Sequence, residues 1–212
     1  MIEDQKFILD QIVTLVKEEK IDVILLCGDI YDKAIPTIEA IHLLDEFLEE
    51  LSDLKVKVLM ISGNHDSAPR VDCFRKVLSR QKVHMIGQPP RTEGESIEKV
   101  TLEDKYGKVN FYLLPFVKPS MVKQIVGTDE NDNNLSYDAT LHKLLERENV
   151  NEAERNVLVS HQFYLPAGKA AEDVERMDSE IRTVGNIDEV SADVLERFDY
   201  AALGHIHKPM TV

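Results

Sequence analysis

The sequence has few cysteines and no long apolar run. Its two cysteines, Cys27 and Cys73, are too few and too far apart to form a disulfide framework. Cys27 lies within an apolar strand pattern, so we predict a buried thiol and a reducing, cytoplasmic compartment. No apolar run approaches the roughly 20 residues that a transmembrane helix needs. The acidic start of the chain has no basic region typical of a signal peptide.

Basic residues are also scarce, with 25 lysines and arginines against 39 aspartates and glutamates and a formal net charge of −14. Proteins that bind nucleic acid by themselves neutralise phosphates with lysine and arginine. The charge therefore argues against an independent DNA-binding module. It leaves open a site in which carboxylates and imidazoles hold cations that contact one phosphate, with a basic partner protein holding the rest of the nucleic acid.

Hydrophobic periodicity predicts alternating helices and strands along a single domain, residues 1–212. Helices are predicted at 3–19, at 37–51 with Pro36 and Thr37 at its start, after a capping Ser67, at 137–148 and at 190–197. Strands are predicted at 22–27, 56–61, 157–159 and 200–203, with an antiparallel hairpin formed by 97–102 and 109–114. Residues 164–180 are predicted to form a long charged loop. The alternation predicts a layered α/β fold.

Four short polar motifs each follow one of the apolar strand patterns. They are Gly28-Asp29-Ile30-Tyr31-Asp32, Gly63-Asn64-His65-Asp66, Ser160-His161-Gln162 and Gly204-His205-Ile206-His207. In open α/β sheets ligands bind beyond the carboxyl ends of the strands, so we expect the motifs to converge. Any one of them alone is typical of a turn. Four of them at four strand ends indicate a metal site.

The side chains of these motifs form a mixed oxygen and nitrogen ligand set. Asp29 has a carboxylate, Asn64 a carbonyl oxygen, and His161, His205 and His207 have imidazole nitrogens. Such a set suits manganese, iron or zinc better than calcium or copper. A carboxylate can also bridge two ions, which lie about 3.5–4 Å apart in two-metal hydrolases. The two histidines of the last motif point the same way if the strand remains extended.

Residues beside these candidate ligands have predicted supporting roles. Gly28, Gly63 and Gly204 each precede a candidate ligand, where a Cβ atom would crowd the sharp turn off the strand. Asp66 is predicted to accept the second N–H of the His65 ring and so to orient it. A simple turn-closing role for Asp66 remains open.

The motifs and three flanking segments resemble the calcineurin-like metallophosphoesterase family and, within it, the SbcD-type nuclease subunits. The flanking segments are Leu114–Pro119, Asp199–Leu203 and Lys208-Pro209. The resemblance covers nearly the whole chain. It implies an α/β fold of the four-layer α/β/β/α sandwich type and a cofactor of two divalent metal ions, most often Mn²⁺.

The resemblance also implies a role for each candidate ligand. Asp29 would bridge the two ions, and one site would be completed by Asn64, His161 and His205. The other ion would be bound by His207. His65, with Asp66 beside it, would be catalytic without binding metal. It would approach the substrate phosphate and protonate the leaving oxygen while a water acidified by the two ions attacks phosphorus.

For the SbcD-type subunits, the resemblance implies a manganese-dependent DNA nuclease that acts in repair, recombination and replication. The implied activities are 3′–5′ exonuclease action on duplex DNA and endonuclease action on single strands and hairpins. The implied partners are DNA, an SbcC-type ATPase and a second copy of the nuclease subunit, with no membrane partner. A basic partner in the complex would also answer the objection raised by the negative charge.

The sequence departs from the family pattern at one motif. The family has an Asp-x-His pair at the end of its first strand, which binds the ion shared with His207, and no Asp-x-His occurs in this sequence. We therefore predict a fragment, or a gene model begun at an internal methionine, without the family's first strand and C-terminal cap domain. One metal site would lack two ligands, which argues against nuclease activity of this chain alone.

Two other functions remain open from the sequence. An enzyme of the same family could hydrolyse a cyclic nucleotide or another small phosphoester. A non-catalytic scaffold could keep the fold and bind one ion or none, since one motif is absent. The other histidines, His42, His84 and His142, have no supporting motif and are predicted to lie outside the site.

Overall fold

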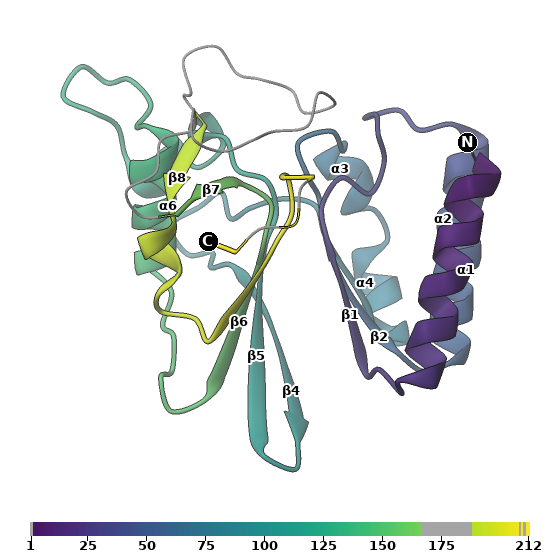
Figure 1. Cartoon of the computed structure of the whole chain (residues 1–212). Coiled ribbons are helices and arrows are strands. Elements are labelled where there is room, and N and C mark those ends of the chain that lie inside the picture. The colour runs from purple at the N-terminus through teal and green to yellow at the C-terminus, as the bar shows by residue number, and fades with distance from the viewer. Residues whose placement is uncertain (1, 167–187, 208, 210) are drawn as a thin grey trace.

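The computed structural model describes residues 2–166, 188–207, 209 and 211–212. Two sheets stack face to face, and helices cover the outer face of each sheet (Figure 1). The order of the four layers is helices, sheet, sheet, helices, which confirms the predicted α/β sandwich. No helix within the described ranges has both the length and the apolar character needed to cross a bilayer.

The first sheet consists of three parallel strands, and its order follows the chain. The strands are β1 (Val23–Cys27), β2 (Lys57–Ile61) and β3 (Val83–Ile86). Successive side chains of β2 face opposite layers. Val58 and Met60 pack against the outer helices, whereas Leu59 and Ile61 pack against the second sheet. Burial on both faces explains why this strand reads as a continuous apolar run.

The outer face of the first sheet is covered by α1 (Ile2–Glu18) and α2 (Ile38–Asp53). Helix α2 begins as predicted, because the Thr37 side chain accepts a hydrogen bond from the N–H of Ala40. The helix expected after Ser67 is instead two short turns, α3 (Ala68–Val71) and α4 (Arg75–Leu78), followed by the 3₁₀ turn η1 (Ser79–Gln81). Phe74 separates α3 from α4 with a φ of 63°, which interrupts a right-handed helix.

The second sheet has the strand order β4, β5, β6, β9. The strands are β4 (Glu98–Asp104), β5 (Gly107–Leu114), β6 (Arg155–Ser160) and β9 (Tyr200–Leu203). Strands β4 and β5 form the predicted antiparallel hairpin, while β5, β6 and β9 are parallel. The elements beyond β5 are η2 (Pro119–Met121), α5 (Lys123–Val126) and α6 (Tyr137–Glu146).

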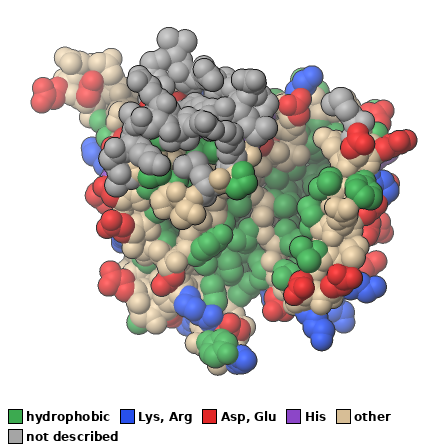
Figure 2. Space-filling view, viewed as in Figure 1, with side chains coloured by type: hydrophobic (Ala, Val, Ile, Leu, Met, Phe, Trp, Pro, Cys, Tyr) green, Lys and Arg blue, Asp and Glu red, His purple; other side chains and the backbone are tan. Residues whose placement is uncertain are grey.

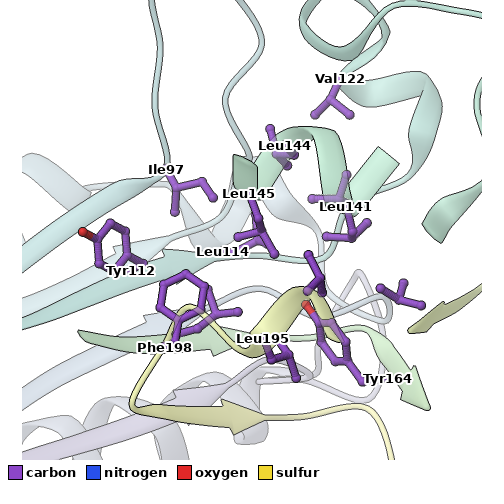
Figure 3. Close-up of a cluster of buried hydrophobic side chains, with 14 of the residues drawn as sticks. Ile97, Tyr112, Leu114, Val122, Leu141, Leu144, Leu145, Tyr164, Leu195 and Phe198 are labelled. Atoms are coloured by element: carbon purple, nitrogen blue, oxygen red, sulfur yellow. The ribbon is translucent and has the colours of Figure 1, made fainter. Parts of the chain in front are cut away.

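Helix α6 closes the outer face of the second sheet with three leucines. Leu141, Leu144 and Leu145 are at most 1% exposed and pack with Tyr112 of β5 and Leu158 of β6 (Figure 3). A second core lies between the two sheets. The sandwich is therefore fixed by apolar contacts on three levels, which hold the strand ends in place.

The segment between β6 and β9 differs from its prediction. Strand β7 (Phe163–Leu165) pairs in parallel with β8 (Glu189–Ser191), and the 3₁₀ turn η4 (Ala192–Leu195) follows. The helix predicted at 190–197 is therefore wrong, because its first residues pair with a distant strand. The predicted loop at 164–180 begins as strand β7, and its residues 167–180 lie outside the described ranges.

Strands β1 and β9 are the outermost strands of their sheets on the same side of the sandwich. Figure 2 shows hydrophobic side chains gathered in a hollow between the two sheets on the face viewed there. At the end of the sandwich, the N–H of Phe116 donates to the carbonyl oxygen of Ser62, 2.9 Å away. This bond joins the loop after β5 to the end of β2, so the carboxyl ends of strands from both sheets meet.

Candidate metal centre

Four strands end where four of the predicted motif residues meet. Asp29 follows β1, Asn64 follows β2, His161 follows β6 and His205 follows β9. The Asn64 Oδ1 atom lies 3.0 Å from His161 Nε2 and 3.0 Å from His205 Nδ1. Asp29 Oδ2 lies 3.2 Å from the same His161 Nε2. The structure thus brings together four side chains separated by up to 176 positions in sequence, and we call them the strand-end cluster.

His161 is buried, and its two ring nitrogens have different partners. Nδ1 lies 2.6 Å from the carbonyl oxygen of Cys27 and donates its hydrogen to that oxygen. In the neutral ring Nε2 then carries a lone pair, which faces the oxygens of Asn64 and Asp29. Acceptor atoms this close need a cation among them, either a proton on Nε2 or a metal ion. A backbone carbonyl on the opposite nitrogen is the usual support of a metal-binding histidine.

The donor set therefore fits a divalent cation by its chemistry. One carboxylate oxygen, one amide oxygen and two imidazole nitrogens converge on one point, and such mixed sets suit manganese, iron or zinc. Within the described ranges, no three His, Cys, Asp or Glu side chains are placed to hold a metal ion by themselves. The cluster reaches four ligands because Asn64 contributes an amide oxygen and lies between the two histidines.

The electrostatics of the cluster keep Asp29 charged. Burial opposes ionisation, but the hydrogen bond and positive charge of His161, together with the N–H of His65, lower the pKa of the Asp29 carboxyl below its ordinary value. Burial raises the pKa of the Cys27 thiol to about 11, so the thiol stays protonated at neutral pH. A protonated thiol is a poor metal ligand. Cys27 therefore supports the cluster through its backbone carbonyl, a role that its residue type did not indicate.

Two members of the cluster have left-handed backbone conformations. The φ angle is 48° at Asp29 and 85° at His205. Such conformations cost roughly 1–3 kcal/mol in non-glycine residues and gather at functional sites. At His205 the chain also leaves the extended path of β9, which ends at Leu203. The extended strand on which a shared orientation of His205 and His207 was predicted is therefore not present.

Two glycines allow the strand ends to approach closely. A Cβ atom on Gly204 would lie 1.9 Å from the Cys27 carbonyl oxygen and 2.6 Å from His161 Nδ1. A Cβ atom on Gly28, whose φ is 89°, would lie 2.3 Å from the same His161 nitrogen. Real Cβ contacts are never this short, so the cluster can close only around glycine at both positions, as the motifs predicted.

Aromatic rings form a wall around His205. The ring of Phe116 stacks on His205 with 6.4 Å between centroids and meets His161 edge-on at 6.3 Å. The ring of Phe163 also lies near His205, with 6.3 Å between their centroids. Sequence reasoning assigned no role to either phenylalanine. The available signal was the position of Phe116 just after β5, a fifth strand that ends at the same edge of the sandwich.

His65 and Asp66 lie in the loop after β2, but they contact different groups. His65 Nδ1 lies 3.0 Å from the carbonyl oxygen of Asp32, so a backbone carbonyl orients the ring. The Asp66 carboxylate accepts hydrogen bonds from the backbone N–H groups of Ile30, Tyr31 and Gly63. The predicted hydrogen bond from the His65 ring to Asp66 is therefore not the contact that the structure shows.

His207 has different surroundings from the strand-end cluster. It is exposed and lines a neighbouring cavity of about 230 Å³. Gln162, Tyr164 and Ile206 also line this cavity. The structure therefore assembles four of the five predicted metal ligands into one group and gives His207 a separate environment.

Comparisons with known proteins agree with this geometry. A sequence profile described as calcineurin-like phosphoesterase matches residues 2–209. The SbcD subunit of the SbcCD nuclease from Staphylococcus epidermidis is 30% identical over 215 aligned residues. The alignment covers 100% of this chain and 53% of that relative, so the chain spans about half the length of the curated relative it matches.

Proposed function

This chain belongs to the calcineurin-like phosphoesterase family, and from that premise we propose that it hydrolyses phosphodiester bonds in DNA with bound divalent cations. The strand-end cluster is the observation that supports this proposal, because two imidazole nitrogens and two side-chain oxygens meet within 3.0–3.2 Å of one another. Such a site needs a cation to be stable. A phosphodiester of DNA supplies the anionic oxygens that a cation so held would attract.

The residues that would hold the first ion are those of the cluster, namely Asp29, Asn64, His161 and His205. When bound, divalent ions in such sites lower the pKa of water and offset negative charge on the phosphate. The protein's part is to fix the ligands beforehand. The Cys27 carbonyl holds the His161 ring by Nδ1, and the Phe116 ring packs on His205. We propose Mn²⁺ as the ion because the mixed ligand set suits it.

His65 is proposed to act on the leaving group. Its Nδ1–H donates to the Asp32 carbonyl oxygen, so the ring exchanges protons through Nε2. His65 also donates its backbone N–H to Asp29 Oδ1, 3.0 Å away, which places it next to the cluster. A proton held at Nε2 would pass to the leaving oxygen of a bound phosphodiester. A second ion shared by Asp29 and His207 is part of the proposal and follows the family resemblance.

The net charge of −14 gives the reason for a partner. DNA binding depends on cationic side chains, and this chain has an excess of acidic ones. We propose that an SbcC-type ATPase supplies the DNA grip and that two copies of the nuclease subunit assemble with it, by analogy with the named relative. The proposed setting is DNA repair and recombination in the cytoplasm.

Calorimetry with Mn²⁺ and hydrolysis assays, with and without the partner ATPase, test this function. We expect Mn²⁺ binding by the wild type and hydrolysis of linear duplex DNA in preference to cyclic nucleotides. Asn64→Ala should weaken binding by more than the 10–100-fold typical of changes around metal ligands. Asn131→Ala, in an exposed loop, is the matched control. A wild-type protein that binds no divalent cation, or that hydrolyses only cyclic nucleotides, would overturn the proposal.

A further inference from the structure

The loops after β1 and β2 are joined by hydrogen bonds that run in both directions. Asp66 of the second loop accepts the backbone N–H groups of Ile30, at 3.0 Å, and Tyr31, at 2.9 Å, from the first loop. Asp29 of the first loop accepts the backbone N–H of His65, at 3.0 Å, from the second loop. Each loop therefore offers one carboxylate to the backbone of the other. We call this arrangement the crossed clamp.

Both oxygens of Asp66 are used in the clamp. Oδ1 accepts from Tyr31, whereas Oδ2 accepts from Ile30 and also from Gly63 of its own loop, at 2.8 Å. Hydrogen bonds from amides to a charged carboxylate are stronger than those between neutral groups. A carboxylate is the side chain that can accept from two directions at once without presenting a hydrogen to either. The residue type at position 66 therefore suits a junction of three backbone amides.

The clamp acts on the two residues that begin the strand-end cluster. Asp29 has a left-handed backbone conformation, with a φ of 48°, that its own loop does not favour. Asn64 lies two residues before Asp66, in the loop that the clamp ties to Asp29. A small rotation of either loop would separate the Asp29 and Asn64 oxygens from His161 Nε2. The ligands must be fixed to well within an ångström for tight binding.

We propose that Asp66 is a positioning residue that fixes the Asp29 loop against the Asn64 loop and thereby sets the affinity of the cluster for its cation. The effect on cation affinity rests on the function proposed above, whereas the clamp itself does not. This role differs from the orientation of His65, because the Asp32 carbonyl contacts that ring. It makes Asp66 a determinant of two loops at once.

Asp66→Asn tests the clamp with almost no change in size. The amide has one acceptor oxygen, so it can serve Tyr31 or the pair Ile30 and Gly63, and its NH₂ group must face the remaining donor. We expect at least one of these three amides to exchange its hydrogen roughly tenfold faster or more, as measured by NMR. Asp72→Asn is the control, because Asp72 also accepts a backbone N–H, from Gly87 at 3.3 Å.

Cation binding is measured on the same variants well below their unfolding temperatures. We expect Mn²⁺ affinity to fall about 10–100-fold in Asp66→Asn and to be unchanged in Asp72→Asn. Asp66→Glu, which keeps both acceptor oxygens, should recover part of the affinity. A purely structural role would lower the unfolding temperature of Asp66→Asn and Asp72→Asn alike and leave Mn²⁺ affinity equal to the wild type.

The outcomes separate the clamp from the proposed function. Fast exchange of the Ile30 and Tyr31 amides in the wild type would refute the clamp, even if no Asp66 variant folds. Faster exchange in Asp66→Asn without any change in Mn²⁺ affinity would refute the positioning role. A wild type with slow amide exchange that binds no Mn²⁺ would leave the clamp standing and overturn the proposed function alone.

Discussion

Adding one methyl group at Gly204 is the smallest change that should open the metal centre. The new Cβ would lie 1.9 Å from the Cys27 carbonyl oxygen and 2.6 Å from His161 Nδ1. Forcing a methyl group into a packed site costs roughly 1–3 kcal/mol. Losing the hydrogen bond between His161 and Cys27 adds about 1 kcal/mol. We therefore expect Gly204→Ala to destabilise the fold by about 3 kcal/mol.

A stability loss of this size corresponds to a fall of about 6–12 °C in the unfolding temperature for a chain of this length. Differential scanning calorimetry measures it, and Mn²⁺ titration should show weaker binding because the His161 ring is displaced. Gly94→Ala is the matched control, since a Cβ there would contact nothing within 4 Å. Equal unfolding temperatures and equal Mn²⁺ affinities for the two variants would refute the close approach of β9 to β1.

Three further changes test other parts of the structure. Leu144→Ala should cost about 2–5 kcal/mol in a urea unfolding series, because the side chain is 1% exposed and its loss leaves a cavity; a loss under about 1 kcal/mol would contradict the packing of α6. Burial opposes protonation of His142, but the Asp138 carbonyl and the Asp193 carboxylate raise its pKa above the ordinary value, so its contribution is complete below about pH 6.5 and is lost as the pH rises through the raised pKa. His142→Gln should therefore be less stable than the wild type at about pH 5.5 and closer to it at about pH 8.5, and a gap independent of pH would be the contrary result. Phe116→Leu should lower Mn²⁺ affinity several-fold by freeing the His205 ring, with Phe116→Tyr near the wild type, and equal affinities by calorimetry would count against the aromatic wall.

The elements with strong local signals were predictable from the sequence. The apolar run of β2 and the periodic pattern of α2 lie where predicted, and Thr37 caps α2 as expected. The helix predicted at 190–197 failed because pairing of Glu189–Ser191 with Phe163–Leu165 prevailed over local preference. A short segment of this kind follows its tertiary neighbours, which periodicity along the chain does not contain.

The residues of the candidate site divide in the same way. Asp29, Asn64, His161 and His205 could be predicted because each follows an apolar strand, and parallel strands place their carboxyl ends together. The role of Asp66 could not, since its partners Ile30 and Tyr31 are 36 and 35 positions away in sequence. The sequence suggested the adjacent His65 as its partner.

The sequence by itself determined which residue types follow the strands, and with them the kind of ion and reaction that the site can support. Only the tertiary structure decided which of these residues meet. A single turn at His205, with φ of 85°, places that ring on Asn64 and gives His207 another environment. The Cys27 carbonyl reaches His161 across 134 positions. Such contacts depend on the stacking of two sheets, because packing sets the distance between strand ends whereas local sequence sets only where each strand stops.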